Sequence, residues 1–209
     1  MKKLIIIDHP LIKRDLTLLR DKRTPSNQFR TILRRTASLI AYEVTRDIKL
    51  KKINVITPLE KTVGFSVVDP IILVPILRAG LGLVGGFVEV IPDARVGHIG
   101  LYRDEETLKP VDYYLKFPNK LRNALAIVLD PMLATGGSGT AAVSLLKSKG
   151  AKEIRFVSLV AAPEGVRLLS KTHPDLIIYT CSLDRQLNKK GYILPGLGDA
   201  GDRIFGTAE

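Results

Sequence analysis

An alternation of strand-like and helix-like patterns from Ile71 onward restricts the fold more than any other feature. Five apolar runs predict strands, namely IILVPIL, RVGHIGLY, ALAIVLD, EIRFVSLVAA and DLIIYTC. Segments with helical spacing lie between them, at 81–90, 138–149 and about 163–171. Continuous apolar strands alternating with helices are typical of a parallel sheet covered on both faces. The pattern predicts an α/β fold with a mainly parallel twisted sheet flanked by helices.

The first seventy residues depart from this alternation. A long amphipathic helix is expected with Ser26 as its N-cap and with apolar residues at helical spacing as far as Val44. The runs INVITPLE and KTVGFSVV follow, with Pro58 and Lys61 near their turn, and predict a β-hairpin arm. At 209 residues, with no repeat or low-complexity linker, the chain 1–209 is expected to form one domain.

Composition narrows the class of protein. A hydrophobic fraction of 45% and a charged fraction of 25% are typical of a globular protein, and no apolar run is long enough to cross a bilayer. The continuous apolar stretch before Asp8 has only four residues, which does not match a signal peptide. The single cysteine, Cys181, lies in an apolar run, which favours a buried thiol in a reducing compartment. We therefore expect a cytoplasmic protein with no membrane partner.

The formal net charge of +11 is unevenly placed, because residues 1–61 carry 15 Lys and Arg against 6 Asp and Glu. A basic N-terminal third could attract nucleic acid. Few aromatic residues accompany these charges, so a solvated helix face is the favoured interpretation. Substrate phosphates would also favour a positive protein, and nucleic acid is therefore not the expected partner.

The stretch VLDPMLATGGSGTAAVSLLKSKG carries the most specific chemistry. A predicted buried strand ends at Asp130, a glycine-rich turn follows, and a helix is expected with Ser138 as N-cap and Gly150 just beyond its end. Backbone N–H groups at such a helix start bind phosphate. The aspartate would repel a phosphate, so we expect it to serve hydroxyls or a metal on the same ligand. The combination predicts a sugar-phosphate site.

Arg78 and Asp130 both fall at the carboxyl ends of predicted strands, where ligands bind in sheets of this kind. We expect them to face one site. The segment YRDEET places Arg103 beside three carboxylates, either in a solvated loop or in a lid that closes on an anionic leaving group. The three histidines show no metal-ligand spacing, and no Ser or Cys lies in a nucleophile-elbow motif.

Two glycine motifs leave a dinucleotide-binding protein open as an alternative. GLGLVGG matches G-x-G-x-x-G and GSGTAA matches G-x-G-x-x-A. The second lies too far beyond its strand, and no acidic residue clearly ends the next strand at the expected ribose position. Glycines that pack against a neighbouring element are the other explanation of GLGLVGG.

The C-terminal run NKKGYILPGLGDAGDRIFGT interleaves glycines with apolar residues, unlike a disordered tail. A structured loop that brings its backbone close to a ligand is expected. Main-chain N–H and C=O groups presented there could recognise the edge of a flat base. Asp199 and Asp202 add carboxylates that could reach a metal or a sugar.

Together these motifs resemble the uracil phosphoribosyltransferases. DPMLATGGS resembles their phosphoribosyl pyrophosphate loop, PILRAGLG their pyrophosphate loop and GYILPGLGDAGDRIFGT their uracil-binding segment, while YRDEETLKP and LVAAPEG follow in matching order. The resemblance spans nearly the whole chain. Pro131 stands where most related phosphoribosyltransferases have a second acid, which is usual for the uracil branch. The resemblance as a whole implies the type I phosphoribosyltransferase fold with a uracil-binding hood at about 183–209.

The resemblance implies conversion of uracil and 5-phosphoribosyl pyrophosphate to UMP and pyrophosphate, assisted by Mg²⁺. Departure of pyrophosphate leaves an oxocarbenium-like ribose, so catalysis needs charge stabilisation rather than a covalent nucleophile. Asp130 and Arg103 are implied as catalytic residues. The phosphoribosyl pyrophosphate site is implied to contain Arg78, Arg103, Asp130, Pro131, Met132, Leu133, Ala134, Thr135, Gly136, Gly137, Ser138 and Asp199. The uracil site is implied to contain Ile193, Gly198, Asp199 and Ala200.

Further properties follow from the resemblance alone. No strong protein ligand for Mg²⁺ is implied, although Asp199 could contact it through water. Family members assemble as homodimers or homotetramers, and some are activated by GTP. A pyrimidine-responsive RNA-binding regulator that retains the same machinery is the remaining alternative.

Overall fold

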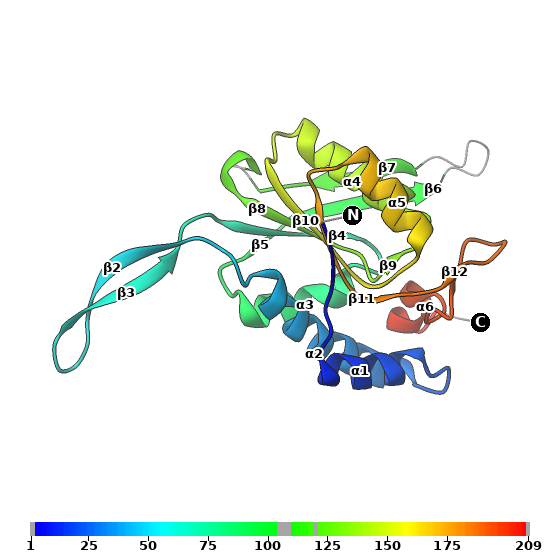
Figure 1. The fold of residues 1–209 in the computed structure, drawn as a ribbon, viewed down its shortest axis with the longest axis horizontal. Helices are drawn as coiled ribbons and strands as arrows, with labels where there is room; N and C mark the ends of the chain where they lie inside the picture. The colour runs from blue at the N-terminus through cyan, green and yellow to red at the C-terminus, as the bar shows by residue number, and fades with distance from the viewer. Residues whose placement is uncertain (1–2, 104–109, 119–120, 208–209) are drawn as a thin grey trace.

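The computed structural model describes residues 3–103, 110–118 and 121–207 (Figure 1). The strands of its main sheet are Leu4–Ile6 (β1), Ile71–Leu77 (β4), Arg95–Val96 (β5), His98–Arg103 (β6), Pro110–Lys116 (β7), Leu125–Leu129 (β8), Met132–Leu133 (β9), Glu153–Ala161 (β10) and Ile177–Leu183 (β11). Two smaller sheets are formed by Leu50–Ile56 (β2) with Lys61–Val67 (β3), and by Gln186–Leu187 (β12) with Ile193–Leu194 (β13). The helices are Pro10–Arg20 (α1), Ser26–Val44 (α2), Leu81–Val90 (α3), Gly137–Ser148 (α4), Pro163–Thr172 (α5) and Ala200–Phe205 (α6).

The main sheet has the order β1-β11-β10-β8-β4-β6-β7, with β5 added beside β4 and β9 beside β10. Its pairings are parallel except that of β6 with β7. The predicted α/β fold with a mainly parallel sheet is therefore confirmed. None of the helices within the described residues is long and apolar enough to cross a membrane.

Helices cover both faces of the sheet, with α1, α2, α3 and α6 on one face and α4 and α5 on the other (Figure 1). The side chains of β4 alternate between the two sides, as the period of a strand requires. Ile71 and Leu73 join the buried cluster that includes α2, while Ile72 and Val74 join the cluster that includes α4. Burial on both faces explains why β4 and β8 are continuously apolar.

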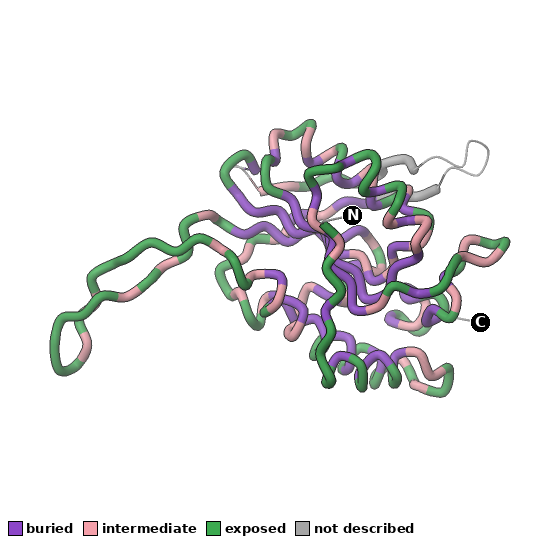
Figure 2. Tube along the Cα trace, in the orientation of Figure 1, coloured by how far each residue is buried: buried purple, intermediate pink, exposed green. Residues whose placement is uncertain are grey.

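The predicted hairpin arm is confirmed as β2 and β3, residues 50–67, and we call it the arm. It extends well away from the sheet and is almost entirely exposed (Figure 2). Several apolar side chains are exposed on it, among them Ile56, Leu59, Val63 and Phe65. Isolated two-stranded hairpins are marginal in water, so such an arm is typical of a surface that packs on another chain.

Two predicted helix caps are wrong. Pro25 holds the N-cap position of α2 in an extended conformation, without a side-chain hydrogen bond, and Ser26 is the first helical residue. Gly136, in the left-handed conformation, holds the N-cap position of α4, and Ser138 lies inside the first turn. Gly150 has φ +92° just beyond α4, as predicted.

Several elements were not predicted, among them β1, α1 and β7, and one predicted strand is divided. β1 has only three residues, α1 carries Lys13, Arg14 and Asp15 in its middle, and β7 lies in the segment predicted only as charged. The run RVGHIGLY is interrupted at Gly97, whose N–H donates to the Leu73 carbonyl at 2.9 Å.

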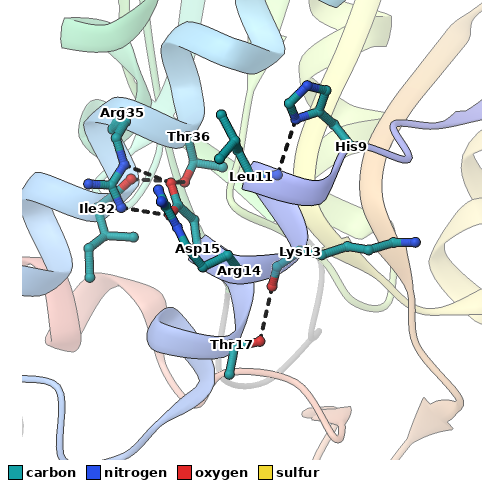
Figure 3. A network of polar contacts seen from close by, with 9 residues as sticks. All are labelled: His9, Leu11, Lys13, Arg14, Asp15, Thr17, Ile32, Arg35 and Thr36. Carbon is teal, nitrogen blue, oxygen red and sulfur yellow. Dashed lines mark hydrogen bonds and ion pairs between the residues drawn. The ribbon is translucent and has the colours of Figure 1, made fainter.

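A buried carboxylate joins α1 to α2 (Figure 3). The Asp15 carboxylate is fully buried and accepts hydrogen bonds from Arg35 at 2.6 and 2.8 Å and from Arg14 at 2.9 and 3.0 Å. Burial raises the pKa of Asp15, but the hydrogen bonds from the two arginines outweigh it, and the pKa lies below its usual value. Asp15 is therefore ionised at neutral pH, and its buried charge is stabilised by the two arginines.

We predict that Arg35→Met lowers the free energy of unfolding by about 1–2 kcal/mol, because Arg14 alone then compensates the buried charge. Because the pKa of Asp15 is lowered in the folded state, this contribution exists at neutral pH and is lost as the pH falls below about 4. Denaturant unfolding of both proteins at pH 7 and at about pH 3 measures it. An equal difference at both pH values would contradict the assignment.

Candidate active site

Two predicted site residues follow neighbouring strands of the sheet. Arg78 comes directly after β4 and Asp130 directly after β8, and these strands are parallel with Pro75 opposite Leu129. Parallel neighbours end at the same edge of a sheet, which is where ligands bind in open α/β folds. The prediction that both residues lie at strand carboxyl ends is confirmed.

The glycine-rich segment between β8 and α4 forms a tight loop. Its turn is made by Gly136 with φ +86°, a conformation that side chains disfavour. A Cβ on Gly136 would also lie only 2.8 Å from the carbonyl oxygen of Gly165 in α5. The loop thus leads directly into α4, whose first N–H groups lack acceptors within the helix and point outward from its positive end. This arrangement is suited to an anion.

The Asp130 carboxylate lies at the start of the same loop. Its Oδ1 accepts a hydrogen bond from the N–H of Met132 at 3.3 Å. The residue keeps some exposed area, yet burial of the carboxyl group raises its pKa to about 7, partly offset by that hydrogen bond. A carboxyl group tuned to neutral pH beside an anion-binding loop is typical of a functional site.

The C-terminal segment 183–207, which we call the hood, lies beyond this edge. It contains the β12–β13 hairpin and α6, and Asp199 caps α6 by accepting from the N–H of Asp202 at 3.0 Å. Ile193 and Ala200 are buried in the core, whereas Gly198 and Asp199 are exposed. Because the side chains of Ile193 and Ala200 are used in packing, only their main chain remains for a ligand.

Arg78 connects the sheet edge to the hood. Its guanidinium lies 3.4 Å from Asp202 Oδ1 and 5.8 Å from the ring centroid of Phe205. A Cβ on Gly201 would lie 3.2 Å from Asp199 Oδ1 and 4.0 Å from the Arg78 guanidinium. The structure therefore brings Arg78 and Asp199 together, although they are distant in sequence.

Glu164, a residue not proposed from the sequence, joins the hood to the glycine-rich loop. Its Oε1 accepts from the N–H of Leu187 in β12 at 3.2 Å, and its neighbour Gly165 packs against the Ala134 carbonyl. That hydrogen bond and one from its own N–H lower the pKa of Glu164. The only sequence signal was its position in LVAAPEG, at the start of a predicted helix.

One predicted residue cannot be placed. Arg103 ends β6, but its side chain, like residues 104–109, lies outside the part of the chain that the structure describes. Its role stays a prediction.

A cavity of about 340 Å³ borders the hood and is lined by Arg20, Lys22, Pro195, Gly196, Leu197, Gly198, Asp199, Asp202 and Arg203. Two other cavities, of about 340 and 620 Å³, include the first residue of β4, at the opposite edge of the sheet. Only the first cavity contains residues predicted to bind a ligand.

The dinucleotide alternative loses its main support. A dinucleotide-binding motif would form a turn before its helix. GLGLVGG instead lies within α3, apart from Gly80, the residue just before the helix. A Cβ on Gly86 would lie 2.2 Å from the Arg34 carbonyl oxygen of α2, so this glycine permits close helix packing. The packing interpretation of the motif is confirmed.

The fold is that of a phosphoribosyltransferase. The adenine phosphoribosyl transferase of Trypanosoma brucei, solved in complex with AMP, pyrophosphate and ribose-5-phosphate, superposes with a TM-score of 0.59 over 90% of this chain and 87% of that one. At 11% identity this similarity concerns the fold alone. The structure of the AQ2163 protein from Aquifex aeolicus agrees more closely, with a TM-score of 0.93, 35% identity, and coverage of 98% and 99%.

Sequence comparison gives the particular family. The family model for uracil phosphoribosyltransferase matches residues 6–207. The uracil phosphoribosyltransferases of Finegoldia magna and Salinibacter ruber are 56% and 53% identical, over 99% and 100% of this chain and the full length of each relative. The chain belongs to the uracil phosphoribosyltransferase family.

Proposed function

We propose that this protein is a pyrimidine salvage enzyme that converts uracil and 5-phosphoribosyl pyrophosphate to UMP and pyrophosphate, with residues 1–209 as one catalytic domain. The observation that carries the proposal is the Asp130 carboxylate at the start of a glycine-rich loop, on the sheet edge that Arg78 shares. Membership of the family supports the choice of uracil.

The phosphates are bound by two groups of residues. Residues 134–138 hold the 5′-phosphate of the ribose through main-chain N–H groups and hydroxyls, where the positive end of α4 adds a favourable field. Arg78 binds the pyrophosphate, whose charge displaces the weak contact of this arginine with Asp202. Arg103 completes the pyrophosphate site from the end of β6.

Asp130 acts on the ribose. Its carboxylate accepts from the ribose hydroxyls and stabilises the positive charge that grows on the ring as pyrophosphate departs. A fixed negative group in a poorly solvated site is worth more than the same group in water. The reaction therefore proceeds without a covalent nucleophile.

Magnesium is the implied cofactor. No group of three His, Cys, Asp or Glu gathers into a metal site among the described residues, so the ion would be held largely by substrate phosphates, as Mg²⁺ commonly is. The exposed Asp199 fits a contact through water, since one of its oxygens already caps α6. When bound, the ion neutralises charge on the leaving pyrophosphate.

Uracil is recognised mainly by main-chain groups of Ile193, Gly198, Asp199 and Ala200. The core packing of Ile193 and Ala200 supports this, because it fixes their backbone and removes their side chains from the site. A rigid main chain presents a fixed pattern of donors and acceptors to the edge of the base.

The RNA-binding alternative is not favoured. Basic side chains of the N-terminal third make internal contacts: Arg35 binds Asp15, Arg34 binds Glu89, and Arg30 donates to the Ile204 carbonyl at 2.8 Å. These contacts give the three arginines structural roles within the molecule. Activation by GTP stays a prediction from the family.

The direct test combines purified protein, Mg²⁺, labelled uracil and phosphoribosyl pyrophosphate. We expect UMP to form steadily, and to stop forming when either Mg²⁺ or phosphoribosyl pyrophosphate is omitted. Absence of UMP from a folded sample would overturn the proposed function.

Asp130→Asn is expected to lower kcat about a hundredfold or more, because the amide carries no charge in the transition state. In the wild-type protein, kcat/KM should also fall as the pH drops below about 7, where Asp130 becomes protonated. The variant is its own control, since its residual pH profile reports every titrating group of enzyme and substrate except Asp130. Identical profiles for the two proteins would remove Asp130 from the catalytic residues.

Cytosine is expected to be rejected by roughly 10⁴-fold in kcat/KM, because its edge leaves fixed main-chain groups unpaired. Competition between the two labelled bases measures the ratio. Comparable use of cytosine would contradict main-chain recognition.

We also propose that the protein is a homodimer or homotetramer held in part by the arm. Sedimentation should give a multiple of 23.0 kDa for the wild type and a smaller species for the double variant Val63→Lys, Phe65→Lys. Thr62→Lys, which adds charge on the other side of β3, is the control. A monomeric wild type would contradict the proposal.

A further inference from the structure

Gly196, in the hood, is held by hydrogen bonds through both its N–H and its carbonyl group. Its N–H donates to Asp184 Oδ2 at 2.9 Å, and its carbonyl accepts from Arg20 Nη1 at 2.7 Å. Gly196 is buried and lies between Ile193 and Gly198, two of the residues that we assign to uracil. The main chain of the base-binding segment is therefore anchored at its centre.

The two anchoring side chains also bind each other. Arg20 and Asp184 form two parallel hydrogen bonds, of 2.8 and 2.6 Å, and Ser182 donates to Asp184 at 2.7 Å. Asp184 is 5% exposed. Burial raises the pKa of Asp184, but hydrogen bonds from Arg20, Ser182 and Gly196 outweigh it and lower the pKa. A bidentate pair of this kind is among the most directional contacts that side chains make.

Arg20 comes from the end of α1, and this end supports the hood at a second place. The guanidinium of Arg203, in α6, donates to the carbonyl of Leu19 and, at 2.7 Å, to that of Asp21. The same guanidinium donates to the Leu197 carbonyl at 2.9 Å, next to Gly196. The end of α1 thus contacts and supports the main chain of residues 196–203.

Recognition by main-chain groups places a strict demand on the backbone. A side chain adjusts its rotamer to a ligand, whereas a peptide group is directed only by the turn that holds it. Small displacements of recognition groups have large effects, since an error of about 1 Å can cost roughly a hundredfold in rate. The base site therefore requires support at the turn that carries its peptides.

We propose that Arg20 and Asp184 are positioning residues for the base: together they fix the Gly196 turn so that the main chain of residues 193–200 matches uracil. The inference rests on the proposed function of the hood. Neither side chain takes part in the chemistry at the ribose, so they act on base binding and base choice rather than on phosphoribosyl pyrophosphate.

Steady-state kinetics of Arg20→Met and Asp184→Asn test the proposal. We expect the KM for uracil to rise about tenfold or more, while the KM for phosphoribosyl pyrophosphate changes less than about twofold. The preference for uracil over cytosine should fall in the same variants. Arg20→Lys keeps the charge but cannot form the two parallel hydrogen bonds, and should give an intermediate KM for uracil.

Arg155→Met is the matched control. Arg155 is also a buried arginine that binds an aspartate, Asp47, at 2.6 Å, but it lies near the start of β10, at the opposite edge of the sheet. It should lower the melting temperature and leave the KM for uracil unchanged. If it raises the KM for uracil as much as Arg20→Met does, general loss of stability explains the effect and the proposal is wrong.

The outcomes separate the two levels of inference. A wild-type protein that forms no UMP overturns the proposed function before any variant is compared. A wild type that forms UMP, with unchanged uracil KM in the folded variants, overturns only the positioning role. Should Arg20→Met and Asp184→Asn fail to fold, Arg20→Lys decides, and an unchanged uracil KM in it contradicts the proposal.

Discussion

The parallel pairing of β4 and β8 is the constraint on which the site depends. It brings the ends of two buried strands to one edge, so that Arg78 and Asp130 emerge at the same edge although 51 residues lie between them in the chain. The glycine-rich loop begins at the same edge and passes directly into α4. Every other part of the site is arranged around this edge: α5 packs behind the loop through Gly165, and the hood meets Arg78 from beyond it.

The arginines of the two N-terminal helices lie largely outside the proposed anion site. The arginines of α1 and α2 mainly bind carboxylates and carbonyls that hold helices together, as Arg35 does with Asp15. The surface suited to a phosphate is instead built from peptide N–H groups at the start of α4, whose direction is set by Gly136. The net charge of +11 therefore gives little information about the ligand. The glycine-rich loop with the left-handed Gly136 is much more informative.

The sequence predicts those features that depend on local pattern. Alternating apolar runs identified the sheet, and the loop after Asp130 and the structured C-terminal segment were recognised from their glycines. The caps assigned to Ser26 and Ser138 were wrong, because proline and a left-handed glycine took those positions. The contacts of Arg20 with Asp184 and of Glu164 with Leu187 were not foreseen, since they join segments without any periodic signal. Such pairings are decided by tertiary packing, which no local pattern encodes.

The contact between α1 and the hood also determines when the proposed base site can exist during folding. Arg20 reaches Asp184 across 164 residues and Gly196 across 176, so these contacts close loops that contain most of the chain. Closing such loops is entropically costly until the sheet between them has formed. During synthesis, α1 emerges early, and its contacts with the hood can form only after the C-terminal residues have been made. The proposed phosphate-binding edge can thus be complete in a chain that does not yet distinguish one base from another.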